Sequence, residues 1–274
     1  MERKELSTSE QGFSYFGAQA YWGVTKHMGG INATHELATL CHIDKDKYIL
    51  EVGCGTGVSA CNLVKRYGCQ VIGVDISDRM IEWARKRARR NSVEHKVQFR
   101  TADAQNLPFE DNLFDVAICE SVTAFPEDKQ RAVNEYVRVT KAGGYVGMNE
   151  GTWIKASPPT ELVEYIDRTM ARANFLSADG WKALLETASL TNIIVRTYKI
   201  NAFSQWLNEM KGLDFQDRLD RLRGLKDFIS LFVSSSNFRK YAKEIMPSAE
   251  IIKNLFTYLG YGVYVGRKEP TVKE

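Results

Sequence analysis

The chain has 274 residues, of which 44% are hydrophobic and 26% charged, and its formal net charge is +3. This composition excludes a disordered chain, and so small a charge does not call for a nucleic-acid partner. Length and composition predict one large α/β domain or a domain with a cap. No run approaches the roughly 20 apolar residues of a membrane span. Residues 1–16 lack the apolar centre of a signal peptide, and the five cysteines show no metal-ligand spacing. Both observations favour a cytoplasmic protein with reduced thiols.

Short β-rich runs alternate with helical patterns from residue 48 onward. The runs with strand character are 48–54, 69–76, 97–103, 114–121, 145–150, 191–200 and 261–268. The helical patterns between them are 57–67, 78–91, 126–140 and 178–189. We expect the third helix to begin at Pro126 and to stop at the Gly143-Gly144 pair. The alternation predicts right-handed crossovers and a doubly wound, mostly parallel sheet, which binds ligands at the carboxyl ends of its strands.

Three stretches interrupt the alternation: residues 1–46, about 150–177 and about 201–260. The third is helical in pattern, dense in large apolar side chains, and leaves the sheet at its carboxyl edge. We therefore predict an N-terminal helical cap over 1–46, a core over 47–200 and 261–270, and a helical lid inserted at 201–260. The sequence leaves open whether the apolar residues of the lid line a substrate pocket, form its own core or join two copies in a homodimer.

A glycine-rich segment, EVGCGTG over residues 51–57, lies between the first predicted strand and the first predicted helix. Glycines there allow a tight turn and a close approach of a ligand to the backbone. The helix that follows begins with unpaired N–H groups. A dinucleotide loop needs a further glycine where this chain has Val58, so the spacing favours a cofactor without a pyrophosphate.

Several motifs in this order resemble those of the class I S-adenosylmethionine-dependent methyltransferases, over about residues 46–150. EVGCGTG resembles the family's cofactor loop, GVDIS over 73–77 the end of its second strand, and ADAQNLPFEDNLFD over 102–115 its adenine-contacting segment. RVTKAGGY over 138–145 resembles the turn before its fifth strand, with Ala142 in place of the usual proline. The subgroup resembled contains the ubiquinone/menaquinone, sterol and tocopherol enzymes. The resemblance implies a seven-stranded Rossmann-like sheet with an antiparallel last strand, and S-adenosylmethionine as the cofactor.

The resemblance also implies roles for single residues. Asp75 would accept hydrogen bonds from both ribose hydroxyls, which suits a carboxylate because it only accepts. Asp103 and the amide of Ala104 would contact the adenine, and Met80 would pack on the adenine face. The cofactor-binding residues that the resemblance implies are Glu51, Gly53, Cys54, Gly55, Gly57, Asp75, Ile76, Met80, Ala102, Asp103, Ala104, Glu120 and Ser121.

Candidates for catalysis and substrate contact lie at two other places. Glu120, which ends the fourth strand, has either a catalytic or a local structural role. His27 is the only histidine near the predicted site, so it is the other catalytic candidate, because a weakly acidic acceptor needs a base. Aromatic residues before the core and polar residues after the fifth strand are the substrate candidates. These substrate candidates are Tyr21, Trp22, His27, Asn149, Glu150 and Trp153.

The implied cofactor sets the chemistry, because a nucleophile attacks its sulfonium methyl in line while the protein supplies alignment and desolvation. We predict methyl transfer to a small, partly apolar molecule, with no metal ion and no nucleic acid. Two alternatives stay open: a nucleic-acid or protein methyltransferase, and a non-catalytic protein that binds the cofactor. The basic run over 85–90 is read as a solvated helix face. Arsenic chemistry through Cys54 and Cys119 is not favoured, because Cys54 lies within the glycine loop.

Overall fold

The computed structural model describes residues 14–23, 25 and 27–270. Seven strands form one sheet in the order β3-β2-β1-β4-β5-β8-β7, and a short strand, β6, pairs with β5 beside this path. The strands are β1 Tyr48–Val52, β2 Gln70–Asp75, β3 Val97–Thr101, β4 Phe114–Glu120, β5 Thr140–Trp153, β6 Leu176–Ser177, β7 Leu190–Lys199 and β8 Leu259–Lys268. The helices are α1 Tyr15–Trp22, α2 Gly30–Leu40, α3 Val58–Tyr67, α4 Asp78–Arg90, α5 Lys129–Val139, α6 Thr160–Thr169, α7 Ala178–Thr187, α8 Ala202–Lys211, α9 Phe215–Ser234, α10 Ser236–Ile245 and α11 Ala249–Tyr258.

The sheet has the predicted direction of strands. β3, β2, β1, β4 and β5 run parallel, whereas β8 is antiparallel to both β5 and β7. Buried side chains of α2, α3 and α4 form the hydrophobic core on one face, and those of α5, α6 and α7 form the core on the other. The predicted fold class, a doubly wound, mostly parallel seven-stranded sheet, is therefore confirmed.

The helix predicted over 126–140 has different ends from those expected. It begins at Lys129 because the Asp128 side chain caps it by accepting the N–H of Arg131. Its last residue is Val139, and β5 begins at the next residue instead of after the glycine pair. The prediction of a stop at Gly143-Gly144 was wrong, because both glycines lie inside β5. Gly143 has a φ of 81°, near a register shift between β4 and β5.

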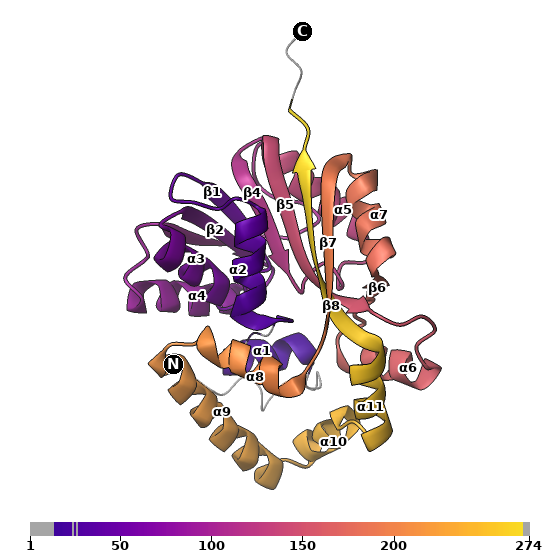
Figure 1. Ribbon diagram of the computed structural model, residues 1–274. Helices are drawn as coiled ribbons and strands as arrows, with labels where there is room; N and C mark the ends of the chain where they lie inside the picture. The colour runs from indigo at the N-terminus through magenta and orange to yellow at the C-terminus, as the bar shows by residue number, and fades with distance from the viewer. Residues whose placement is uncertain (1–13, 24, 26, 271–274) are drawn as a thin grey trace.

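The segments that interrupt the alternation of strands and helices lie at different places on the sheet. α8 to α11 connect β7 to β8 at the carboxyl edge of the parallel strands (Figure 1). α2 instead packs on one face of the sheet, where Leu37 and Ala38 are fully buried. On α9, Leu222, Leu225 and Ile229 are each more than half exposed, so this part of the predicted lid does not form its own core. Among the residues described, none of the helices has both the length and the apolar composition to span a bilayer.

Candidate active site

The glycine loop joins β1 to α3 in a backbone conformation that needs glycine. Gly53 and Gly55 have φ angles of 70° and 51°, in the left-handed region. A Cβ atom at Gly53 would overlap the side chain of Val122, and one at Gly55 would overlap that of Thr25. Neighbouring segments therefore close tightly on this backbone, which requires glycine at both positions.

A cavity of about 440 Å³ opens at the carboxyl edge of the sheet, beside the glycine loop. Its lining includes every predicted cofactor-binding residue except Gly57. A Cβ atom at Gly57 would meet the ring of Phe99 at 2.8 Å and Cβ of Ala84 at 3.0 Å, so its close contacts are with the core side chains that pack beneath the loop. The structure therefore brings residues from the ends of four strands, β1 to β4, to one cavity.

Asp75 connects the end of β2 to the glycine loop. Its Oδ2 atom accepts the N–H of Gly55 at 2.9 Å, and its Oδ1 atom accepts the N–H of Ser77 at 2.9 Å. Burial raises the pKa of this carboxyl, although the backbone hydrogen bonds act in the opposite direction. Each oxygen can still accept a further hydrogen bond, and the side chain lines the cavity. Asp75 is thus placed to bind a ligand that carries hydroxyl groups.

Glu51 brings a buried carboxylate to the cavity wall. Its side chain is almost inaccessible to solvent, and its Oε2 atom has no hydrogen-bond partner among the described residues. Burial raises the pKa of Glu51 well above its usual value, and the negative charge of Glu120 raises it further. An unpartnered buried oxygen is costly, and a cationic or hydrogen-bond-donating ligand would satisfy it. This observation fits the ammonium group of S-adenosylmethionine.

Glu120 and His27 meet through a third residue that the sequence analysis missed. Oγ1 of Thr34, on α2, lies 3.0 Å from both carboxylate oxygens of Glu120 and 3.1 Å from Nε2 of His27. His27 Nε2 itself lies 3.6 Å from Glu120 Oε2. If the Thr34 hydroxyl donates to Glu120, it must accept from Nε2–H of His27, which leaves Nδ1 of a neutral ring as a proton acceptor. The three side chains therefore form one hydrogen-bonded unit.

The backbone that carries His27 is held from three sides. The Met28 N–H donates to Ser121 Oγ at 3.2 Å, and Nδ2 of Asn149 donates to the Met28 carbonyl oxygen at 2.6 Å. Gln205, on α8, accepts the N–H of Gly29 at 2.8 Å and donates to the carbonyl oxygen of His27 at 2.9 Å. Ser121, which follows β4, thus fixes the position of His27 together with β5 and α8.

The residues predicted to contact substrate do not all reach the cavity. His27 lines it, whereas Tyr21, Trp22, Asn149, Glu150 and Trp153 do not. Asn149 and Glu150 are fully buried. The Tyr21 ring lies beneath Arg79, the Trp22 ring packs near Phe228 and Phe238, and the Trp153 ring packs near Phe175.

Glu150 supports the cavity from behind. Its Oε1 atom accepts the N–H groups of Val122 at 3.1 Å and Thr123 at 2.7 Å. Burial raises its pKa to about 7. Val122 lines the cavity, so Glu150 shapes the wall through this turn without reaching the cavity itself.

Aromatic residues from two segments form another part of the wall. The Tyr15 and Phe16 rings of α1 lie 5.9 Å and 4.9 Å from the ring of Phe125, measured between centroids. All three residues line the cavity. The cysteines beside the cavity offer no reactive thiolate, because burial raises the pKa of both Cys54 and Cys119.

Comparisons with known proteins find methyltransferases. The family described as "Methyltransferase domain" matches residues 50–148. O-methyltransferase cnsE of Penicillium expansum is 30% identical over 197 residues, which are 71% of this chain and 71% of that protein. Tocopherol O-methyltransferase of Arabidopsis thaliana is 31% identical over 59% of this chain and 49% of its own length. An uncharacterized protein of Haemophilus influenzae is 32% identical over 60% of this chain and 66% of its own length.

Solved structures share the fold at lower identity. The MccD protein superposes with a TM-score of 0.68 and 18% identity, over 90% of this chain and all of the other. Geranyl diphosphate C-methyltransferase from Streptomyces coelicolor A3(2) has a TM-score of 0.63 and 16% identity, over 87% of this chain and 79% of the other.

The chain belongs to the class I S-adenosylmethionine-dependent methyltransferases. It spans about half to two thirds of the length of several curated relatives.

Proposed function

We propose that this protein binds S-adenosylmethionine in the 440 Å³ cavity and transfers its methyl group to a small, partly apolar acceptor, with S-adenosylhomocysteine as the second product. The observation that carries this proposal is the convergence of nearly all the predicted cofactor-binding residues on one cavity. The cofactor supplies a methyl group activated by a sulfonium sulfur. The residues of the chain bind it, orient the acceptor and keep water out.

The cavity has the polar groups that such a cofactor needs. Asp75 binds the ribose hydroxyls, Asp103 and the Ala104 amide bind the adenine, and Met80 packs on its face. The lining also contains a set of acidic side chains, which are Glu51, Asp75, Asp103, Glu120 and Glu127. The side chains of this set that are ionised favour the sulfonium cation over the neutral sulfur of S-adenosylhomocysteine, because opposite charges attract strongly in a partly buried site. The same lining therefore promotes product release.

The acceptor side is built from the aromatic wall and the His27–Thr34–Glu120 unit. The rings of Tyr15, Phe16 and Phe125 suit an apolar part of the acceptor. His27, with its ring oriented by Thr34 and Glu120, takes a proton from the acceptor atom where the chemistry requires it. α1, whose Tyr15 and Phe16 line the cavity, covers this site and helps to exclude water.

A screen of neutral phenols, amines, thiols and apolar alkenes tests the proposal. The protein is incubated with S-adenosylmethionine, and S-adenosylhomocysteine and methylated product are measured by mass spectrometry. We expect stoichiometric formation of both with at least one acceptor class. Binding of the cofactor without methylation of any class would instead support a non-catalytic binding protein.

A further inference from the structure

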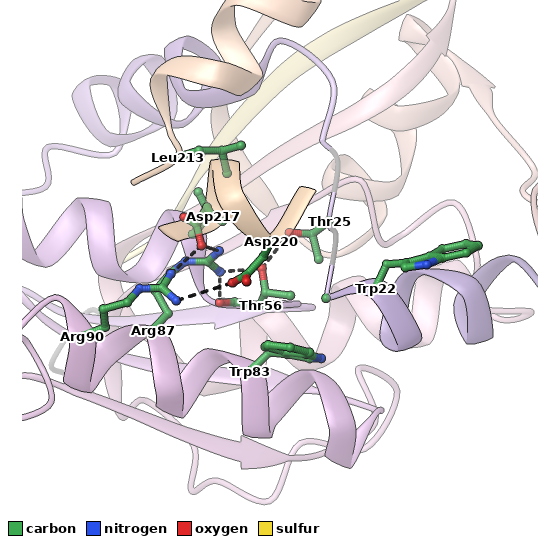
Figure 2. A pocket seen from close by; sticks show the side chains of 11 residues that line it. Trp22, Thr25, Thr56, Trp83, Arg87, Arg90, Leu213, Asp217 and Asp220 are labelled. Carbon is green, nitrogen blue, oxygen red and sulfur yellow. Dashed lines mark hydrogen bonds and ion pairs between the residues drawn. The ribbon is translucent and has the colours of Figure 1, made fainter. Parts of the chain in front are cut away.

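Arg87 is a buried arginine within the basic run of α4. Only 7% of the residue is exposed, so the interpretation of residues 85–90 as a solvated face was wrong at this position. Its guanidinium donates to both the carbonyl oxygen and Oγ1 of Thr56. It also lies 2.6 Å from Oδ1 of Asp217. Figure 2 shows this guanidinium between the glycine loop and α9. A buried arginine with this set of partners has a specific positional role.

The partners of Arg87 belong to two parts of the site. Thr56 lies between Gly55 and Gly57 in the glycine loop, and its Oγ1 atom lies 3.1 Å from Oγ1 of Thr25. Asp217 lies in the first turn of α9, where it forms a capping box with Asp214. One guanidinium therefore connects the cofactor loop to the first turn of the longest helix of the lid.

Arg90 lies one turn further along α4 and makes a different set of contacts. It pairs with Asp214 at 2.9 Å and also with Asp217, and its Nη1 atom lies 4.0 Å from Asp220. These carboxylates belong to the start of α9, and Figure 2 shows Arg90 with two of them, Asp217 and Asp220. Arg87 and Arg90 thus both hold α9, and Arg87 in addition donates to Thr56.

We propose that Arg87 is a positioning residue that couples the glycine loop to the lid. This proposal rests on the proposed function. Docking of Asp217 holds the guanidinium where it fixes the Thr56 carbonyl, and the loop then keeps the shape that binds the cofactor. By thermodynamic reciprocity, a bound cofactor that fixes the loop also favours docking of α9. Undocking α9 removes the carboxylate that holds the Arg87 guanidinium in place, so the guanidinium no longer fixes the Thr56 carbonyl and the two events are linked.

The test compares Arg87→Gln with Arg90→Gln as a matched control on the same helix face. Affinity for S-adenosylhomocysteine is measured by calorimetry, and hydrogen exchange of residues 215–234 is measured with and without this ligand. We expect the ligand to slow exchange of these residues in the wild type. In Arg90→Gln, hydrogen exchange of residues 215–234 is faster than in the wild type, with and without the ligand. The ligand still slows this exchange by the same factor as in the wild type. In Arg87→Gln, affinity falls about tenfold or more, and the ligand no longer changes exchange at α9.

Retention of both the affinity and the ligand-dependent protection in Arg87→Gln would overturn the coupling. If that variant does not fold, Arg87→Lys replaces it, since lysine keeps the charge but cannot contact Thr56 and Asp217 in the same planar fork. For Arg87→Lys we expect a partial loss of affinity for S-adenosylhomocysteine and a partial loss of the ligand-dependent protection of α9. If both stay at the wild-type level, the proposal is overturned. If the wild-type protein binds S-adenosylhomocysteine but hydrogen exchange of α9 does not slow, the coupling is contradicted and the proposed function is not. Absence of binding by the wild type would contradict the proposed function itself.

Discussion

Asn149 Nδ2 donates a 2.6 Å hydrogen bond to the main-chain carbonyl oxygen of Met28, and the same nitrogen lies 3.4 Å from Oε2 of Glu120. β5 is thereby joined to the segment that carries His27. Asn149 Oδ1 has no partner among the residues that the structure describes. The side chain therefore contributes as a donor, and it shapes the site from behind the cavity wall.

Replacing Asn149 by Leu removes this donor at nearly constant volume. We expect the free energy of unfolding to fall by about 1–2 kcal/mol. The rate of methyl transfer falls as well, because the His27 segment loses one of its anchors, whereas affinity for S-adenosylhomocysteine changes little. Thr152→Val is the control, since Thr152 is also buried in β5 but bonds to Tyr264. Equal losses of activity in both variants would show that the effect is only one of stability.

Thr34→Val tests the bridge between His27 and Glu120. Valine keeps the shape of threonine but cannot hydrogen-bond, so His27 loses the group that sets its tautomer and orientation. We expect kcat to fall by about 10- to 100-fold, while affinity for S-adenosylhomocysteine stays within about threefold. Thr39→Val, on the exposed side of the same helix, should leave both unchanged. A wild-type kcat in Thr34→Val would exclude a catalytic role for this unit.

The raised pKa of the buried Glu150 carboxyl predicts that the stability of the protein depends on pH. Burial raises its pKa from the usual 4.5 to about 7, so the folded protein holds this proton more tightly than the unfolded chain does. The stabilisation is fully present below pH 4.5 and is lost as the pH rises through 7. Between pH 5 and pH 8 the free energy of unfolding falls by roughly 2–3 kcal/mol through this group. Glu150→Gln, which keeps the acceptor for Val122 and Thr123, should not show this loss in urea titrations at pH 5 and pH 8. The same pH dependence in both proteins would contradict the assignment.

Much of the cavity lining could be predicted because its residues lie in short motifs at the ends of successive strands. The glycine-rich segment over 51–57 leaves β1, and Asp75 is the last residue of β2. Because β1 and β2 are neighbouring parallel strands, their ends lie side by side. Asn149 and Glu150 were placed at the correct sheet edge, but both side chains are buried and serve backbone groups. Strand ends are visible in a sequence, whereas the partner of a buried polar side chain is not.

The contacts that the sequence could not reveal join distant parts of the chain. Thr34 and Glu120 are 86 residues apart, Arg87 and Asp217 are 130 apart, and Gln205 is 178 residues from His27. None of these pairs lies in a recognisable motif. An arginine in a basic run looks solvated until the helix that covers it is placed, so the burial of Arg87 follows only from the tertiary structure.

The most direct test of the account is a calorimetric titration of the wild type, Asp75→Asn and Asp78→Asn with S-adenosylmethionine and S-adenosylhomocysteine. Asp75 lines the cavity, whereas the neighbouring Asp78 is exposed and bonds to Thr101. We predict binding by the wild type and by Asp78→Asn, and affinity about thirtyfold or more lower for Asp75→Asn, because hydrogen bonds to a charged acceptor are lost. Absence of binding by the wild type, or equal affinity in the two variants, would contradict the assignment of this cavity to the cofactor.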